Sequence, residues 1–310
     1  MKHSLPLFVG AVGFLVGTIG CEDTALRKTE ALPQRTKPEV WVTNYPLNYF
    51  TTRLAGELAT VIYKAPSDED PAFWKPSDED LSGFQQADLI ISNGATYEKW
   101  AATASLPEEK VIDTAAGFST QFIETKDATT HSHGNEGAHS HGGTAFTTWI
   151  DFKQAIEQAN AVRGALAKLC PQGATAIDER FAALKSDLAS LDATMEKAAK
   201  AAGGRPLMAS HPIYQYWARR YGLNVATVLW EPENVPDDAA MDTLQKILKD
   251  HPATLMIWED TPDPASVAKL KAIGVSSVVF APTSNTPDSG DFLSAMQTNI
   301  QQVEQAFATP

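Results

Sequence analysis

The stretch ATAIDERFAALKSDLASLDATMEKAAKAA, residues 174–202, decides the fold, because it predicts one uninterrupted helix near the middle of the chain. Its apolar residues recur at intervals of three and four, which is the spacing of one helix face; they are Ile177, Phe181, Leu184, Leu188, Leu191, Met195 and Ala198. No glycine or proline interrupts it, so a helix of about 40 Å is expected at 1.5 Å per residue. A coiled-coil dimer would show a similar pattern. The flanking regions favour a helix packed within its own chain.

Short apolar runs alternate with amphipathic stretches on both sides of this helix. The runs are VWVT (40–43), ADLIISNG (87–94), RPLMAS (205–210), LNVATVLW (223–230), ATLMIWE (253–259) and VSSVVFAP (275–282), and a closing helix is expected from Gly290 to Phe307. Strands interleaved with helices predict an α/β fold with mainly parallel sheets. We therefore expect two α/β lobes, 40–171 and 204–310, joined by one long backbone helix within 172–203.

The N-terminus has the layout of a secretory signal, with Lys2 before an apolar run from Leu5 to Ile19. The run is too short to span a membrane comfortably. Thr18-Ile19-Gly20 before Cys21 resembles a bacterial lipobox, which predicts that Cys21 is lipidated and becomes the mature N-terminus. An ordinary cleaved signal is the alternative. Residues 22–39 have no apolar period and predict a tether. We thus expect an exported protein, anchored by lipid to the bacterial cell envelope on its periplasmic or outer face.

Composition excludes several classes of protein. The net charge of −13 argues against a nucleic-acid partner and suits a protein that meets cations. Cys170 is the only cysteine after Cys21, so no intrachain disulfide is expected in the mature chain. The sequence has no G-x-S-x-G, H-E-x-x-H or phosphate-loop motif, and we expect that it is not an enzyme.

Four of the seven histidines fall in one segment, HSHGNEGAHSHGG, residues 131–143. They are His131, His133, His139 and His141. Paired histidines in a glycine- and serine-rich context suit shared metal binding and do not suit a packed core. This segment therefore predicts a metal-binding loop, and a polar linker is the alternative. Its affinity should be modest, because ordering a loop costs conformational entropy.

Taken together, these features resemble one family, the zinc/manganese-type (ZnuA-like) solute-binding proteins of ABC transporters. Four local stretches carry the resemblance, in order along the chain: NYPLNYFTTRLAG (44–56), KPSDEDLSGFQQADLIISNGATYEKW (75–100), SHPIYQYWARRYGL (210–223) and DFLSAMQTNIQQVEQAF (291–307). The resemblance implies two lobes around a metal-binding cleft, a monomer, and an ABC-transporter membrane permease as the partner.

The resemblance also implies where metal ligands should lie. His211 in SHPIY matches a family ligand at a strand-to-helix turn that faces the cleft. The first ligand position falls on Ala72 in one alignment and on Asp70, beside Glu69, in another, and Asp70 remains a candidate. Thr147 in TTWIDF stands where the family has its second histidine.

The late acidic ligand of the family is also missing from its usual place. Ala281 and Pro282 stand there, and Asp288 and Asp291 follow in the same loop. The His-rich segment ends only six residues before Thr147, so one of its histidines is within chain reach of the cleft. We therefore expect a metal site split between His211 and this loop.

The function expected from this pattern is a receptor that binds Zn²⁺, or as second choice Mn²⁺, and delivers it to an ABC permease. Imidazole and carboxylate donors suit both ions. Zinc binding should fade as pH falls through about 6.5, because imidazole must be neutral to coordinate. Two alternatives remain open: a zinc buffer that relies on the His-rich loop, and a relative that has lost the metal and binds another ligand in a pocket. The residues that could line such a pocket are Phe73, Trp74, Trp149, Trp230 and Glu231.

Overall fold

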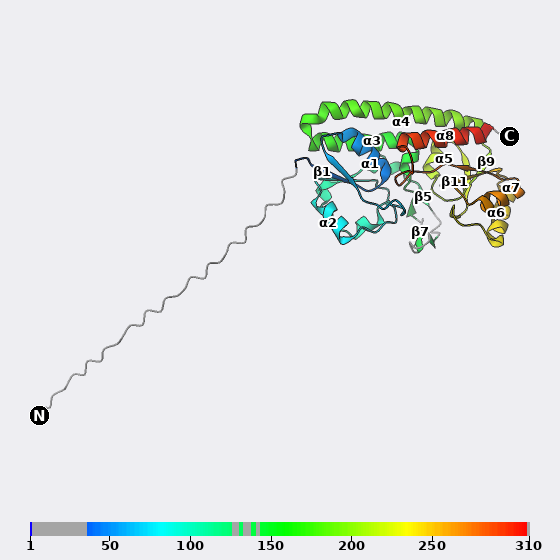
Figure 1. The fold of residues 1–310 in the computed structure, drawn as a ribbon, viewed down its shortest axis with the longest axis horizontal. Coiled ribbons are helices and arrows are strands. Elements are labelled where there is room, and N and C mark those ends of the chain that lie inside the picture. The colour runs from blue at the N-terminus through cyan, green and yellow to red at the C-terminus, as the bar shows by residue number, and fades with distance from the viewer. Residues whose placement is uncertain (2–35, 126–129, 133–137, 141–142, 309–310) are drawn as a thin grey trace. The chain divides into compact units, whose positions relative to one another are not determined.

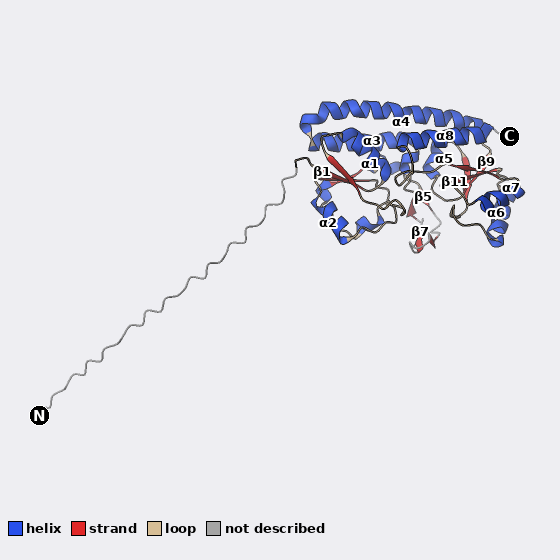
Figure 2. Ribbon diagram, in the orientation of Figure 1, coloured by secondary structure: helices blue, strands red, loops and turns tan. Residues whose placement is uncertain are grey.

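The computed structural model describes residues 1, 36–125, 130–132, 138–140 and 143–308. From Lys37 on, the described residues form two α/β lobes, each built on a parallel sheet, with one long helix alongside both (Figure 1). The long helix and several neighbouring helices form a layer on one side of the two sheets, and shorter helices lie away from this layer, at the outer ends of the lobes (Figure 2). The predicted fold class is confirmed. Among the described residues, no helix is long and apolar enough to cross a membrane.

In the first lobe, four parallel strands lie in the order β2-β1-β3-β4. The strands are β1 (Glu39–Val42), β2 (Thr60–Tyr63), β3 (Leu89–Ser92) and β4 (Val111–Asp113), and the helices are α1 (Tyr45–Ala55), α2 (Asp78–Gln86) and α3 (Phe152–Leu169). Polar caps fix the helix starts: the Asn44 side chain accepts from Leu47 N, and Asp151 accepts from Lys153 N. Strand β1 begins at Glu39, the last residue of the segment that the sequence predicted as a tether.

The second lobe repeats this plan with the strand order β10-β9-β11-β12, again all parallel. Its strands are β9 (Pro206–Ala209), β10 (Asn224–Thr227), β11 (Leu255–Trp258) and β12 (Ser276–Val279), and its helices are α5 (Gln215–Tyr221), α6 (Asp238–Asp250), α7 (Pro264–Ala272) and α8 (Phe292–Ala308). Because all strands are parallel, their carboxyl ends meet at one edge of the sheet, where open α/β sheets bind ligands.

Helix α4 (Ala174–Ala202) is the continuous backbone helix that the sequence predicted. Its apolar face is buried at Ile177, Leu184, Leu188, Leu191 and Met195. It packs against α3 and α8, which lie beneath it in Figure 1. The helix ends at Gly203, whose φ of +60° is a left-handed conformation that glycine adopts without strain. The apolar face is thus covered within the chain, as expected for a packed spine.

The loop after β12 connects the lobes by hydrogen bonds. Trp149 Nε1 donates to Pro282 O at 2.7 Å, and Tyr45 N donates to Ser284 O at 3.0 Å. Asn285 makes three further bonds to the first lobe: its Nδ2 donates to Pro66 O and to Glu69 O, and its Oδ1 accepts from the Tyr63 hydroxyl at 2.8 Å. A segment of the second lobe is therefore fixed to the first lobe.

These bonds and the unbroken α4 predict that the lobes move little on metal binding. A helix of this length resists the hinge that flexible connecting strands would provide. Small-angle scattering of the protein with and without Zn²⁺ should give nearly equal radii of gyration. A contraction of several ångströms would contradict this expectation.

Candidate metal centre

Three acidic or imidazole side chains meet at the carboxyl edge of the second sheet. His211 follows β9, Glu231 follows β10 and Glu259 follows β11 directly. The strand order β10-β9-β11 makes these strands neighbours, with β9 in the middle. Residues that are far apart in the sequence are therefore brought together by the sheet alone.

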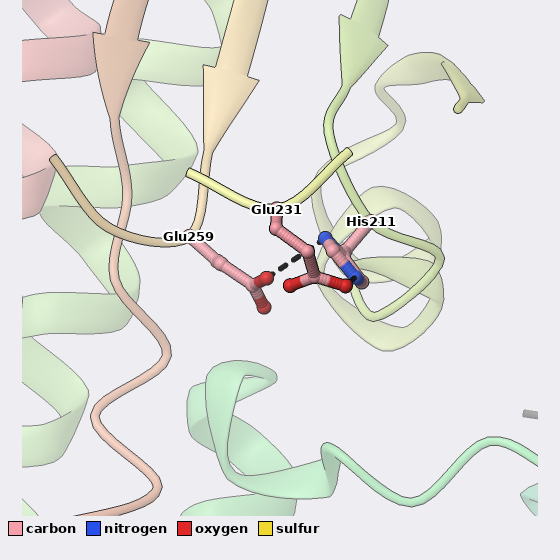
Figure 3. A group of neighbouring side chains, drawn as sticks. All are labelled: His211, Glu231 and Glu259. Atoms are coloured by element: carbon pink, nitrogen blue, oxygen red, sulfur yellow. Dashed lines mark ion pairs between the residues drawn. The ribbon is translucent and has the colours of Figure 1, made fainter. Parts of the chain in front are cut away.

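The three side chains point toward one another (Figure 3). His211 Nδ1 lies 2.8 Å from Glu259 Oε1, and His211 Nε2 lies 3.3 Å from Glu231 Oε1. One ligand atom from each residue can be chosen so that all lie within 4.8 Å of one another. The imidazole is 1% exposed and Glu231 is 8% exposed, so both are withdrawn from bulk water.

The two glutamates control the protonation of His211. Burial lowers the pKa of the imidazole, but the negative charges of Glu259 and Glu231 and the hydrogen bonds to both carboxylates outweigh it. They raise the pKa of His211 to about 10. The metal-free site therefore holds an imidazolium between two carboxylates at neutral pH, and this cation offsets charge that would otherwise be buried alone.

These three side chains line a cavity of about 530 Å³ between the lobes. The first lobe contributes Asp70, Tyr97 and Thr147, among others, and the loop after β12 closes one side. Six carboxylates line the cavity, and none of its described lining residues is lysine or arginine; the six are Asp70, Glu231, Glu233, Glu259, Asp260 and Asp288. Such a lining produces a negative potential that favours cations.

The ligand positions expected from the family resemblance fall in different places. Asp70, Thr147 and Ala281 line the cavity, whereas Ala72 is fully buried and borders a second cavity. Asp70 is outside the close group around His211, and its Oδ1 accepts from Ala72 N at 2.9 Å. Among the described residues, then, the three close donors all belong to the second lobe.

Asp288 and Asp291, the two acidic residues that follow Pro282 in the sequence, also lie in different places. Asp288 lines the cavity. Asp291 instead lies at the start of α8, where its Oδ1 accepts from Ser294 N at 2.9 Å. Asp291 therefore serves as a helix cap rather than a cavity residue.

The His-rich segment is described only in part. His131 lies in β6 (Thr130–Ser132) and His139 in β7 (Ala138–Ser140), where the two residues pair in an antiparallel register. A second short pair, β5 (Glu124–Thr125) with β8 (Gly143–Thr144), closes the segment. His133, His141 and the lipobox residue Cys21 lie outside the described residues. The split between His211 and this loop therefore stays a prediction.

The aromatic residues considered as pocket lining have different roles. Trp149 does line the cavity. Trp230 packs in the core of the second lobe, with its ring 6.2 Å from that of Trp258. Phe73 and Trp74 border the second cavity instead. Phe73, Trp74 and Trp230 are therefore not among the described residues that line the cavity with His211.

Sequence reasoning missed the two glutamates as partners of His211. The sequence indicates Glu231 only as a possible pocket residue and does not indicate Glu259 as a ligand. The available signal was positional: each glutamate follows a predicted buried strand, where a parallel sheet places its ligand-binding residues.

Comparisons with known proteins agree with this architecture. The family model described as zinc-uptake complex component A, periplasmic (ZnuA), matches residues 40–306. The zinc-binding lipoprotein AdcA of Streptococcus pneumoniae (strain ATCC BAA-255 / R6) is 24% identical over 280 residues, which are 87% of this chain and 56% of that protein. The chain thus spans about half the length of this relative.

Two further comparisons extend the match. The high-affinity zinc uptake system protein ZnuA of Bacillus subtilis (strain 168) is 25% identical over 265 residues, 82% of this chain and 80% of that protein. The crystal structure of the Zn(II)-bound ZnuA-like domain of S. pneumoniae AdcA aligns with a TM-score of 0.74 at 21% identity, covering 88% of this chain and all of that one. This likeness shows the fold. Since the family model covers most of its length, the chain belongs to the ZnuA family of periplasmic zinc-uptake components.

Proposed function

We propose that this protein is an extracytoplasmic receptor that binds Zn²⁺, or as second choice Mn²⁺, and delivers it to an ABC permease. The observation that carries the proposal is the convergence of His211, Glu231 and Glu259 at the edge of the second sheet. Membership of the ZnuA family and the names of the zinc-binding relatives support it. We propose a binding protein rather than an enzyme, and the relatives named for zinc binding and zinc uptake support this.

The geometry of the three side chains fits a metal ion. Ligand atoms about 2.0 Å from a tetrahedral zinc ion lie roughly 3.3 Å from one another. Since one ion takes only one of the two imidazole nitrogens, the relevant measure is one donor atom from each residue, and these three atoms lie within 4.8 Å of one another. One imidazole and two carboxylates provide donors that both Zn²⁺ and Mn²⁺ accept. We propose Asp70 as a further first-lobe candidate on the same cavity.

We also propose that the mature protein is a monomer that begins at a lipidated Cys21 and is held at the cell envelope. The signal-like N-terminus supports this, and one of its relatives is named a lipoprotein. Two or three acyl chains would hold it firmly, whereas one chain alone anchors weakly. Mass analysis of the protein from membranes would detect the lipid on Cys21.

The experiment that tests the proposed function is metal analysis of the mature protein. Residues 22–310 should retain zinc on purification and bind about one Zn²⁺ in the cleft on titration. Zinc-loaded protein should also raise the ATPase rate of its permease in proteoliposomes. Zinc binding without this stimulation would favour the buffer alternative, and no metal binding at all would favour a relative that binds another ligand.

The raised pKa of His211 predicts that zinc displaces a proton. The metal-free imidazole holds its proton up to about pH 10. Apparent cleft affinity should therefore rise by up to about tenfold per pH unit from pH 6.5 to 9, rather than level off just above 6.5. Calorimetry at pH 7.5 in two buffers of different ionisation enthalpy should show about one proton released per Zn²⁺. Absence of release would mean that His211 is already neutral.

Deleting residues 131–141 tests the proposed metal role of His131, His133, His139 and His141. We expect a lower zinc stoichiometry, because those histidines bind further ions with modest affinity. If one of them completes the cleft site, the affinity of the tightest site should fall as well. The matched control replaces the four histidines by asparagine and keeps the length of the loop. Unchanged stoichiometry and affinity would identify the segment as a polar linker.

A further inference from the structure

The donor set of the proposed metal site is one-sided. Among the described residues, the donors that lie within 4.8 Å of one another are His211, Glu231 and Glu259, and all three belong to the second lobe. Zinc in proteins takes four ligands, and a site with three protein ligands keeps its fourth position for water or another molecule. The question is therefore which group would fill the fourth ligand position, on the side that faces the first lobe.

The first-lobe wall offers hydroxyl groups and rings at this position. Thr147, 4% exposed, has a neutral hydroxyl, which is not among the usual ligands of zinc. Tyr97 lies on the same wall, with its ring 5.3 Å from Phe146 and 5.6 Å from Trp149. Burial raises the pKa of the Tyr97 hydroxyl well above 10, so it remains a neutral phenol.

The Tyr97 hydroxyl is buried and has no hydrogen-bond partner among the described residues. A buried polar group without a partner is unfavourable, and native proteins rarely leave one without water or a ligand. This hydroxyl, on a residue that lines the cavity, can therefore accept a hydrogen bond from a bound ligand or donate one to it.

Space and charge restrict what such a ligand can be. The cavity of about 530 Å³ is far larger than an ion needs, since one water takes roughly 30 Å³ of liquid volume. Six carboxylates line it, with no lysine or arginine among the described lining residues. After Glu231 and Glu259 have neutralised a divalent ion, the remaining carboxylates repel an anionic chelator. A neutral lone-pair donor fits this environment.

We infer that the cleft takes its metal ion together with at least one exogenous neutral ligand, water or an imidazole-type nitrogen base, on the side facing Tyr97 and Thr147. This inference rests on the proposed function and specifies the form in which the ion is carried. Asp70 is the rival within the described chain: it lines the same cavity, but it lies outside the close group of donors, and its Oδ1 accepts from Ala72 N at 2.9 Å.

The test uses the full mature protein loaded with Co²⁺, a spectroscopic substitute for Zn²⁺, and titrated with imidazole. We expect a saturable change in the visible absorption at one imidazole per ion. Mn²⁺-loaded protein should enhance the relaxation of water protons, and imidazole should reduce that enhancement. If imidazole has no effect and the water signal remains, the exogenous ligand is water alone.

Variants at position 147 distinguish the effect of an added metal ligand from the effect of side-chain size. Thr147→His should bind Co²⁺ at least about tenfold more tightly and lose the imidazole response, because its own ring fills the position. Thr147→Leu, similar in bulk but without a donor, should gain no affinity. Tyr97→Phe should still bind the metal but hold the exogenous ligand roughly five- to tenfold more weakly, the effect of one hydrogen bond.

Two results would overturn the inference while leaving the proposed function intact. In the first, the metal binds to the protein, but neither imidazole nor water is detected as its ligand. Alternatively, the response appears only after Asp70→Asn or after deletion of residues 131–141, which would show that the chain itself fills the position. If no metal binds at all, the proposed function fails instead.

Discussion

Alanine at position 211 should remove tight zinc binding from the cleft and destabilise the metal-free protein. His211 is the only imidazole in the close group of described donors, and it lies between both glutamates. Loss of an outer-shell partner costs roughly 10–100-fold in metal affinity, so loss of this direct ligand should exceed 100-fold. Calorimetry of His211→Ala at pH 7.5, compared with the parent, measures the change.

The loss of stability follows from charge. Without the imidazolium, the buried Glu231 loses its ion-pair partner, and breaking a buried ion pair costs about 3 kcal/mol or more; Glu259, whose side chain is 21% exposed, contributes less. The metal-free variant should regain part of this stability below about pH 5, where carboxylates become protonated. Urea unfolding at pH 7.5 and 5 would measure both effects.

His251→Ala is the matched control for this experiment. His251 also belongs to the second lobe, but its Nε2 lies 2.9 Å from Leu207 O and it does not line the cavity. Zinc affinity should stay at the parent value. An equal loss in both variants would mean that general damage to the second lobe, rather than loss of a ligand, lowers binding.

The framework of the fold could be predicted because its determinants are local. The three-and-four spacing from Ile177 to Ala198 belongs to one helix face, and that face is buried in α4. Runs such as LMIW became fully buried strands because parallel sheets are covered on both faces. These patterns need no knowledge of distant residues.

The metal centre could be predicted only in part, because it depends on strand order. The surrounding motif, SHPIY, is enough to indicate His211. Glu259 follows an equally clear strand, but the chain has 38 acidic residues and nothing local distinguishes this one. Only the pairing of β11 with β9 shows that Glu259 lies beside His211. Knowledge of the sheet topology was therefore the missing step.

Removing the negative charge of both glutamates should change zinc affinity and proton release together. Glutamine at positions 231 and 259 keeps the size of the side chain and loses its charge. The double variant should bind zinc more than 100-fold more weakly, since two anionic ligands are replaced by neutral amides. It should also release almost no proton when zinc binds at pH 7.5.

The loss of proton release follows from the direction in which the pKa of His211 changes. Burial by itself lowers the pKa of His211, and the two glutamates are what raise it to about 10. Without them the pKa falls below the ordinary value of 6.5, so the imidazole of the double variant is already neutral at pH 7.5. A direct shift in the His211 titration, followed by NMR of the metal-free protein, checks this independently of zinc.

The single variants should differ in degree, and a third glutamate provides the control. Glu259 lies nearer to the imidazole, at 2.8 Å against 3.3 Å for Glu231, and its charge is the strongest influence that raises the pKa of His211. Glu259→Gln should therefore lower that pKa more than Glu231→Gln does. Glu233→Gln removes one charge from the same cavity lining but lies outside the close group, so it should leave proton release near one per zinc. If all three variants behaved alike, the overall negative charge of the cavity, and not direct contact with His211, would set the chemistry of the site.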